Sequence, residues 1–435
     1  MPLMSLFRNP SKPQSYPLDN AATIYPAART RSWSATYRLG AILKEEVRPD
    51  VLAQAVDDLA PRFPYFYVQL KQGLFWYHLR GVPDTDLVNR EADYPCRPLK
   101  IGRCKKPLFR VIYYKKRIAV EFFHALTDGT GASVFLKSLL ARYFTLLGYQ
   151  IPCTQGVLSP DGTPEPSETE DAYQSLYQPA DRGVSRREDS AYQYNAPSSE
   201  DYLRVVHGLI PVDGLKRVTK AKGVTITEYL VAVYLYAFYQ DMRKRRESIQ
   251  KRREKPIKIS VPANLRPLFG SQTLRNFALF ANVGIDPRKK DYSFDEILRE
   301  TTQKLHAGLE KETLRRIASQ NVSDARMAIS RFSPNFLKRP VLKLSFHLYG
   351  ERLYTSPFSN LGVITVPPEM EPLIDRFETV IGETRKNIIY CAAISYRNLL
   401  NISFSSTSDQ TDIQRYFLTF LAAQGIDVRV ESNIR

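Results

Sequence analysis

The stretch His124-Ala125-Leu126-Thr127-Asp128-Gly129 lies where an alternating strand, residues 117–123, gives way to a helix predicted over about 130–147. Side chains alternate along a strand, so His124 continues the inward-facing series of this one: Ile118, Val120 and Phe122. The imidazole is therefore expected to face the interior of the protein rather than bulk water. An inward histidine beside an Asp-Gly turn, at the end of a strand, is suited to act as a general base.

The composition is that of a globular protein with a marked positive charge. The chain has 435 residues, of which 43% are hydrophobic, and its size suggests two or three domains. It has 62 Lys and Arg against 45 Asp and Glu, a net charge of +17. Such an excess favours polyanions or anionic surfaces. No zinc-finger, helix-turn-helix or RNP-like pattern accompanies the charge, so we expect no nucleic-acid partner.

The cysteines and the apolar segments indicate whether the protein binds a metal and where in the cell it is expected. The four cysteines are dispersed, without the close pairs that bind zinc, so we expect no metal site: Cys96, Cys104, Cys153 and Cys391. So few in a long chain suit a reducing compartment. The N-terminus lacks the layout of a signal peptide, and the longest apolar stretch, 229–239, is too short to span a bilayer. We therefore expect a cytoplasmic protein.

Periodicity divides the chain into an N-terminal lobe (1–160), a polar crossover linker (161–199) and a C-terminal lobe (200–435). Helices are predicted over 49–59, 213–222, 294–319 and 412–424, and after a capping box at Thr225-Ile226-Thr227-Glu228. Strands are predicted over 33–43, 65–79, 108–114, 201–210, 257–261, 277–285, 361–366, 388–396 and 400–405. Since both halves mix strands and helices, we expect an α/β fold.

Two motifs resemble those of a known superfamily. Phe122-Phe123-His124-Ala125-Leu126-Thr127-Asp128-Gly129 and Val261-Pro262-Ala263-Asn264-Leu265-Arg266 are similar to motifs of the CoA-dependent acyltransferases built like chloramphenicol acetyltransferase. These include alcohol acetyltransferases, plant-type H-x-x-x-D acyltransferases and the condensation domains of peptide synthetases. Asn276-Phe277 and the stretches 359–362 and 401–404 add weaker signals, so the resemblance covers about residues 15–430. It implies two chloramphenicol acetyltransferase-like lobes, each a mixed sheet flanked by helices, with a tunnel between them.

The resemblance also implies an activity and roles for single residues. The activity is transfer of an acyl group, such as acetyl, from acyl-CoA to an alcohol or amine, by direct attack with His124 as general base. Asp128 would be structural and would pair with Arg266, whose planar fork suits a carboxylate; Arg62 is the alternative partner. Acyl-CoA would be a co-substrate, with no cofactor bound permanently. Candidates for stabilising the oxyanion are Ser356, Ser359 and Asn360.

Two departures from the superfamily narrow the choice of branch. Phe123 stands where condensation domains usually carry the first of two adjacent histidines, and the D-F-G-W-G element of the plant-type branch is missing. The sequence therefore favours the alcohol acetyltransferase-like branch. Two alternatives remain: acyl transfer or condensation from a thioester bound to a carrier protein, and a catalytically inactive relative that binds or scaffolds.

A basic run lies between a predicted helix and a predicted strand: Arg243, Lys244, Arg245, Arg246, Lys251, Arg252, Arg253 and Lys255. Cations suit the C-terminal end of a helix, so a solvated helix end accounts for it. The alternative is contact of residues 243–255 with CoA phosphates or with an anionic membrane surface. The sequence leaves both open.

Overall fold

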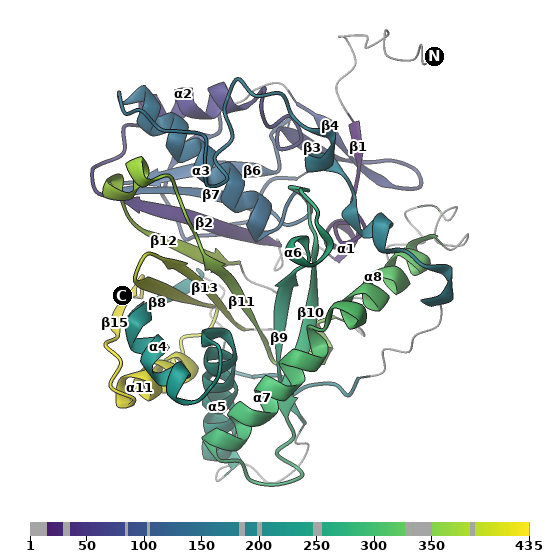
Figure 1. Ribbon diagram of the computed structural model, residues 1–435, viewed down its shortest axis with the longest axis vertical. Coiled ribbons are helices and arrows are strands. Elements are labelled where there is room, and N and C mark those ends of the chain that lie inside the picture. The colour runs from purple at the N-terminus through teal and green to yellow at the C-terminus, as the bar shows by residue number, and fades with distance from the viewer. Residues whose placement is uncertain are drawn as a thin grey trace.

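The computed structural model describes residues 15–28, 35–82, 86–101, 105–181, 188–197, 202–246, 255–326, 334, 350–382 and 388–434. Two main sheets, each mixed and each flanked by helices, lie one above the other, with the N-terminal half of the chain forming most of the upper lobe (Figure 1). The predicted α/β class and the two lobes of mixed sheet and helices are confirmed. A tunnel between the lobes is not shown by the described residues and stays a prediction.

The N-terminal lobe is built on a five-stranded sheet of order β12-β2-β7-β6-β5. Four of its strands come from this half of the chain: β2 (Thr36–Leu43), β5 (Val88–Arg90), β6 (Phe109–Tyr114) and β7 (Arg117–Phe123). Helices α2 (Pro49–Leu59) and α3 (Gly129–Leu146) pack together on it. Phe135 of α3 stacks on Phe66 and meets Phe122 of β7 edge-on, so aromatic rings fill the space between helix and sheet. A small sheet is added by β1 (Ser15–Pro17), β3 (Val68–Gln72) and β4 (Tyr77–Gly81), and a short helix by α1 (Ile24–Ala28).

The C-terminal lobe is built on a seven-stranded sheet of order β10-β9-β11-β13-β14-β8-β15. Its strands are β8 (Arg204–Pro211), β9 (Ile257–Asn264), β10 (Ala278–Ile285), β11 (Ser356–Val363), β13 (Ile389–Tyr396), β14 (Leu399–Ser406) and β15 (Arg429–Ser432). The helices are α4 (Val212–Ala221), α5 (Ile226–Arg246), α6 (Arg266–Phe269), α7 (Phe294–Gly308), α8 (Lys311–Arg326) and α11 (Asp412–Ala423). Helix α5 carries much of the core, since residues 229–235 are all buried. Its predicted capping box is confirmed: Thr225 N–H donates to Glu228 Oε2 (2.7 Å), and Glu228 N–H to Thr225 Oγ1 (3.2 Å).

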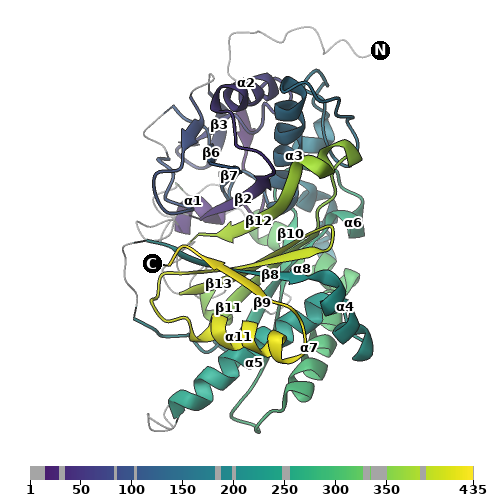
Figure 2. The same cartoon turned by 90° about the vertical axis from the view of Figure 1, so that its left-hand side faces the viewer.

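Two segments join the lobes. Strand β12 (Ile374–Ile381) comes from the C-terminal half but pairs antiparallel with β2, at the junction seen in Figure 2. The β9–α6–β10 hairpin reaches up from the lower sheet to the N-terminal lobe (Figure 1). The sequence did not predict β12, whose inward Glu378 breaks the apolar pattern and pairs with Arg117 (2.6 Å). The division of the chain at residues 160 and 199 remains a proposal, and β12 is a C-terminal strand within the N-terminal sheet.

Two predicted elements need correction. The helix predicted over 294–319 is two helices, α7 and α8, because the Glu310 carboxylate accepts from the N–H groups of Glu312 and Thr313 and so caps a new helix. The strand predicted over 361–366 is β11, which begins at Ser356, where it pairs with β9, and ends near Gly362 at φ +74°. Both errors arise because helix caps and strand partners depend on contacts that periodicity does not register.

The predicted linker has structure of its own where it is described. It forms the 3₁₀ helices Pro166–Thr169, Ala172–Leu176 and Pro179–Asp181. Tyr173 is buried and donates its hydroxyl to the Ala278 carbonyl (2.6 Å), which ties this segment to β10. None of the helices in the described ranges combines the length and the apolar character needed to cross a membrane.

Candidate active site

His124 lies at the end of β7, in the loop that leads to α3. Its backbone N–H donates to the Ala35 carbonyl (2.8 Å), which extends the pairing of β7 with the β2 side of the sheet. The half-buried imidazole stacks on Tyr25, with ring centroids 4.7 Å apart, and contacts Tyr37 at 4.9 Å. Two tyrosine rings thus fix the plane of the imidazole.

Burial controls the charge of this imidazole. It lowers the pKa of His124 below the ordinary histidine value, because a charged ring is poorly solvated there. A hydrogen bond to its own backbone, the negative charge of Asp128 and the hydrogen bond with Asn276 act in the opposite direction. A ring with a lowered pKa is neutral at neutral pH and keeps a lone pair on one nitrogen. That is the state a general base requires.

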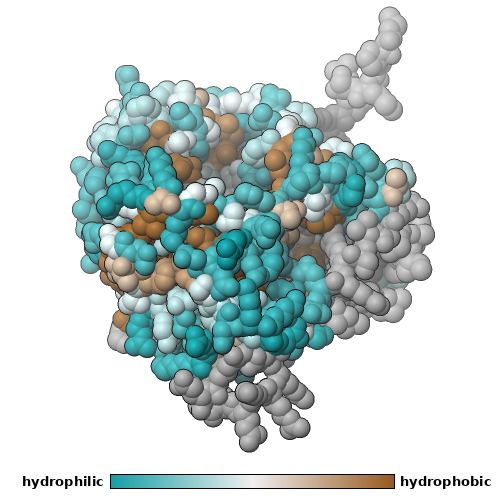
Figure 3. Space-filling view, turned by 60° about the horizontal axis from the view of Figure 1, so that its bottom comes forward, coloured by the Kyte–Doolittle hydropathy of each residue, from teal (hydrophilic) through white to brown (hydrophobic). Residues whose placement is uncertain are grey.

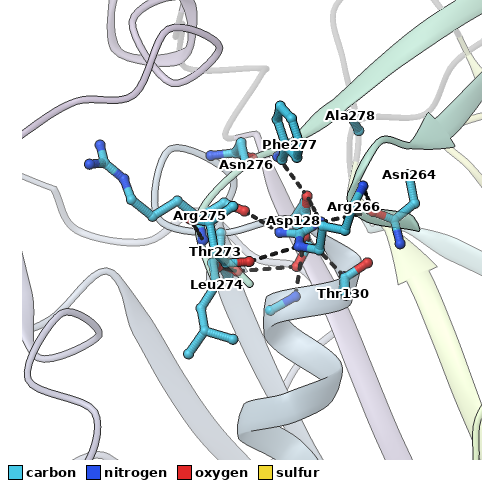
Figure 4. Close-up of polar contacts among 12 residues, drawn as sticks. Asp128, Thr130, Asn264, Arg266, Thr273, Leu274, Arg275, Asn276, Phe277 and Ala278 are labelled. Atoms are coloured by element: carbon cyan, nitrogen blue, oxygen red, sulfur yellow. Dashed lines mark hydrogen bonds and ion pairs between the residues drawn. The ribbon is translucent and has the colours of Figure 1, made fainter. Parts of the chain in front are cut away.

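The carboxylate of Asp128 is fully occupied by donors (Figure 4). Oδ1 accepts from the N–H groups of Thr130 (3.1 Å) and Gly131 (3.2 Å), which caps α3. Oδ2 accepts from the Phe277 N–H (2.9 Å). Arg266 donates to both oxygens, at 2.9 and 3.1 Å. With this many donors, neither oxygen has a free lone pair for a substrate proton.

The guanidinium of Arg266 is equally occupied. Besides its two bonds to Asp128, it donates to the carbonyls of Thr273 and Arg275 and to Asn264 Oδ1. These bonds use all of the donors that a guanidinium has. Arg62, the alternative partner, instead pairs with Glu168 through both terminal nitrogens, at 2.7 and 2.5 Å.

Gly129 and Gly131 lie where residues of the C-terminal lobe pack against the start of α3. A Cβ on Gly129 would lie 2.3 Å from Leu361 Cδ2, and one on Gly131 would lie 2.1 Å from the Leu274 carbonyl oxygen. The second contact is with backbone, which cannot swing aside. Glycine therefore lets the start of α3 lie against the β9–β10 hairpin.

A second polar chain reaches His124 from the other side. Asn276 Oδ1 lies 3.1 Å from His124 Nδ1, and Asn276 Nδ2 donates to Asp19 Oδ2 (3.1 Å). Asp19 is fully buried, and its Oδ2 lies 3.6 Å from Arg275 Nε. Burial raises the pKa of Asp19 to about 6, although Arg275 opposes the shift. Sequence reasoning missed Asp19, which lies in a segment read as an irregular lead-in; its one local signal is the Asx turn to the Ala22 N–H (2.7 Å).

The three oxyanion candidates fall in different settings along β11. The Ser356 hydroxyl is buried and bonded to Tyr234 Oη and to the Ile389 carbonyl, both at 2.7 Å. Asn360 donates to Thr227 Oγ1 and accepts from the Gly362 N–H, both at 2.9 Å. Ser359 is half-buried, two residues before the Leu361 side chain that faces Gly129. Ser356 and Asn360 both bond side chains of α5, so alternation along the strand puts Ser359 on the opposite face of β11.

The basic run is described only in part, because residues 247–254 lie outside the described ranges. Arg243 and Lys244 are exposed, while Arg245 pairs with Asp241 (2.8 Å) and bonds Gln410 (2.9 Å). Seen from the end of the molecule that carries α5 and α7, the surface is mostly hydrophilic, with its hydrophobic areas broken up by polar residues (Figure 3). Within the described ranges, no group of three His, Cys, Asp or Glu side chains is placed to hold a metal ion.

Comparisons with known proteins give one kind of match, which is to solved structures. No protein-family model matches the chain, and no curated protein matches its sequence. The first condensation domain of the CDA synthetase superposes with a TM-score of 0.62 at 16% identity, covering 94% of this chain and 96% of that one. Polyketide synthase associated protein 5 from Mycobacterium tuberculosis gives 0.61 at 14% identity, with the same coverage. TRI3 trichothecene 15-O-acetyltransferase from Fusarium sporotrichioides gives 0.60 at 10% identity over 97% of both chains.

These likenesses extend over nearly the whole length of each partner, so they concern the complete two-lobed architecture. The fold that the resemblance in the sequence motifs implies is thereby confirmed. This chain has the fold of condensation domains and of the trichothecene acetyltransferase.

Proposed function

We propose that this protein transfers an acyl group from the thioester of acyl-CoA to an alcohol or amine acceptor. The observation that carries the proposal is the half-buried His124 imidazole at the end of β7, which stacks on Tyr25 and contacts Tyr37, in a site where burial lowers its pKa. The shared fold supports it, since one protein of that fold is an acetyltransferase and a starter condensation domain of rhizomide synthetase binds C8-CoA.

In the proposed reaction, His124 takes the proton from the acceptor hydroxyl or amine as the acceptor attacks the thioester carbonyl. The tetrahedral intermediate then collapses, and the imidazolium gives the proton to the departing thiolate. No covalent enzyme intermediate forms. Proton transfer by a positioned histidine typically contributes about 10²–10⁴-fold in rate. Asp128 takes no part in proton transfer, because its oxygens are already bonded to Arg266 and to backbone N–H groups.

Ser359 is the oxyanion candidate that this arrangement favours. The Ser356 hydroxyl and the Asn360 amide are already bonded within the C-terminal lobe. The finer parts of the proposal rest on the sequence alone. They are acetyl as the acyl group, an alcohol as the acceptor, a cytoplasmic location, and membrane contact through residues 243–255.

A carrier-protein-bound thioester is the second candidate donor. It is favoured by the condensation domains of the same fold, one of which binds Leu-SNAC together with C8-CoA. Phe123, fully buried in place of a first histidine, favours the CoA donor instead. A catalytically inactive relative remains the third reading; the complete set of His124, Asp128 and Arg266 argues against it.

The proposal is tested by offering the protein matched donors. Acetyl-CoA, octanoyl-CoA and the same acyl groups on a phosphopantetheinylated carrier protein are incubated with mixed alcohols and amines. Released thiol is followed by a disulfide reagent, and the acylated acceptor is identified by mass spectrometry. We expect turnover with acyl-CoA. Turnover with the carrier-bound donors alone would support the second candidate, and turnover with neither would support an inactive relative.

A further inference from the structure

Two polar side chains from distant parts of the chain, Asp19 and Asn276, line up behind the His124 ring. Asp19 comes from the segment before α1, Asn276 from the residues just before β10, and His124 from the end of β7. The links measure 3.1 Å from Asp19 Oδ2 to Asn276 Nδ2, and 3.1 Å from Asn276 Oδ1 to His124 Nδ1. Asp19 and Asn276 are 0% and 3% exposed, so water does not compete for these bonds.

The chemistry of the three groups gives this line a direction. An ionised carboxylate accepts hydrogen bonds and donates none, whereas an amide has one accepting oxygen and one donating nitrogen. With Asp19 ionised, Asn276 must turn its NH₂ toward the carboxylate and its oxygen toward the imidazole. The amide oxygen can bond only a protonated ring nitrogen. Nδ1 therefore carries the proton, and the lone pair of the neutral ring is on Nε2.

The position of Asp19 is itself tightly determined. Its Oδ1 accepts from the Ala22 N–H (2.7 Å), and the Arg275 guanidinium lies beside Oδ2. Arg275 in turn donates to the Pro17 carbonyl (2.7 Å) and lies over the Tyr65 ring, 5.1 Å from its centroid. Figure 4 shows that its side chain runs away from the neighbouring Asp128 carboxylate.

A buried carboxylate is costly, and an uncharged cap such as Asn or Ser would satisfy the Ala22 N–H equally well. The neighbouring Arg275 guanidinium offsets part of this cost. The charge also imposes an orientation on the Asn276 amide, which an uncharged side chain at position 19 would not do.

We propose that Asp19 is a positioning residue for His124, which acts through Asn276 to keep the imidazole in its Nδ1-protonated tautomer with Nε2 free to accept a proton. The value of that tautomer for catalysis rests on the proposed function, since His124 is the general base only if the protein transfers acyl groups. The tautomer itself does not depend on any activity.

The tautomer can be read directly from ¹⁵N chemical shifts of the imidazole nitrogens, which separate protonated from unprotonated positions. The chain has five histidines, so the His124 signals are found by difference from a His124→Gln sample. Spectra are compared at pH 7.5 for the wild type, Asp19→Asn, Asp19→Ala and Asn276→Leu. Asp181→Asn is the matched control, because Asp181 is also buried and paired with an arginine, Arg315, without a bond to this chain of residues.

We expect protonated Nδ1 and bare Nε2 in the wild type and in Asp181→Asn. The Asp19 and Asn276 variants should shift toward the Nε2-protonated form. Asp19→Asn keeps the shape of the side chain and the turn to Ala22, so its spectrum shows the tautomer even if Asp19→Ala fails to fold. In the acyl-transfer assay, Asp19→Asn should lower kcat by roughly ten- to a hundredfold with KM little changed, the effect expected for one lost charge-assisted hydrogen bond.

An unchanged His124 tautomer in Asp19→Asn or in Asn276→Leu would overturn the proposal. A tautomer shift in a protein without any thioester turnover would leave this inference standing and remove the proposed function instead. Turnover in the wild type with no tautomer shift in the variants would remove this inference and leave the proposed function standing.

Discussion

The guanidinium of Arg266 and the carboxylate of Asp128 form a two-pronged ion pair across 138 positions of the chain, with N–O distances of 2.9 and 3.1 Å. The pair joins the β9–α6–β10 hairpin of the C-terminal lobe to the first turn of α3 in the N-terminal lobe. Since that turn follows directly on His124, the ion pair sets the position of the candidate base without touching it.

Removal of Arg266 should destabilise the protein strongly. Arg266→Ala leaves a buried carboxylate with its charge unpaired, a change that typically costs about 3–5 kcal/mol in the free energy of unfolding. Denaturant titration measures it. Arg315→Ala, which breaks the pair of Asp181 with a more exposed guanidinium, is the control and should lose less. Equal losses in both variants would speak against the special burial of the Asp128–Arg266 pair.

Gly131 should not tolerate a side chain. In Gly131→Ala the new methyl group would lie 2.1 Å from the Leu274 carbonyl oxygen, so the hairpin or α3 must shift, at a typical overpacking cost of about 1–3 kcal/mol. Gly214→Ala in α4 is the matched control, because its nearest contact would be an ordinary 3.5 Å. Thermal melting should show a lower Tm for the first variant and an equal or higher one for the second. A Gly131→Ala protein as stable as the wild type would refute the close approach.

Substitution of Ser359 should affect activity, whereas substitution of Ser356 should affect stability. Ser359→Ala should keep its stability and lose about 10²–10³-fold in kcat, the typical loss of one oxyanion donor. Ser356→Ala should do the opposite, since it breaks two buried hydrogen bonds and costs about 1–3 kcal/mol of stability. Full activity in Ser359→Ala would remove that residue from the site.

The pH dependence of turnover should follow the lowered pKa of His124. The base works when it is neutral, so kcat/KM should be level near pH 7 and should fall only below the ordinary histidine value of about 6.5. An alcohol acceptor that does not titrate in this range is needed. Asp19, with a pKa raised to about 6, also becomes protonated on the acid side, so the Asp19→Asn profile is measured alongside. A wild-type midpoint above 6.5 would contradict burial as the dominant influence on His124.

Much of this site could be predicted because it is encoded locally. The alternation of β7, the apolar stripe of α3 and the glycines after Asp128 all lie within one stretch of chain, and α2 spans the expected residues 49–59. Arg266 followed from a resemblance in motif, not from spacing. Its position opposite Asp128 could not have come from periodicity, because 138 residues separate the two.

The missed features depend on contacts between distant segments. Asp19 appeared to be an ordinary turn residue, and nothing in its neighbourhood points to Asn276 or Arg275. Strand β12 carries charged residues on a sheet face where an apolar pattern is expected, and it is stabilised by partners such as Arg117 from the other half of the chain. Patterns of period two or 3.6 detect burial of apolar side chains, but not burial of paired charges.

Removal of the acceptor proton by His124 is tested by comparing thiol release from acyl-CoA in the wild type and in His124→Ala. Circular dichroism and melting first establish that the variant is folded, as expected for a half-buried side chain. We expect kcat to fall by about 10²–10⁴-fold or more in His124→Ala, with binding of acyl-CoA retained. A folded His124→Ala protein that turns over acyl-CoA at the wild-type rate would contradict that role of His124.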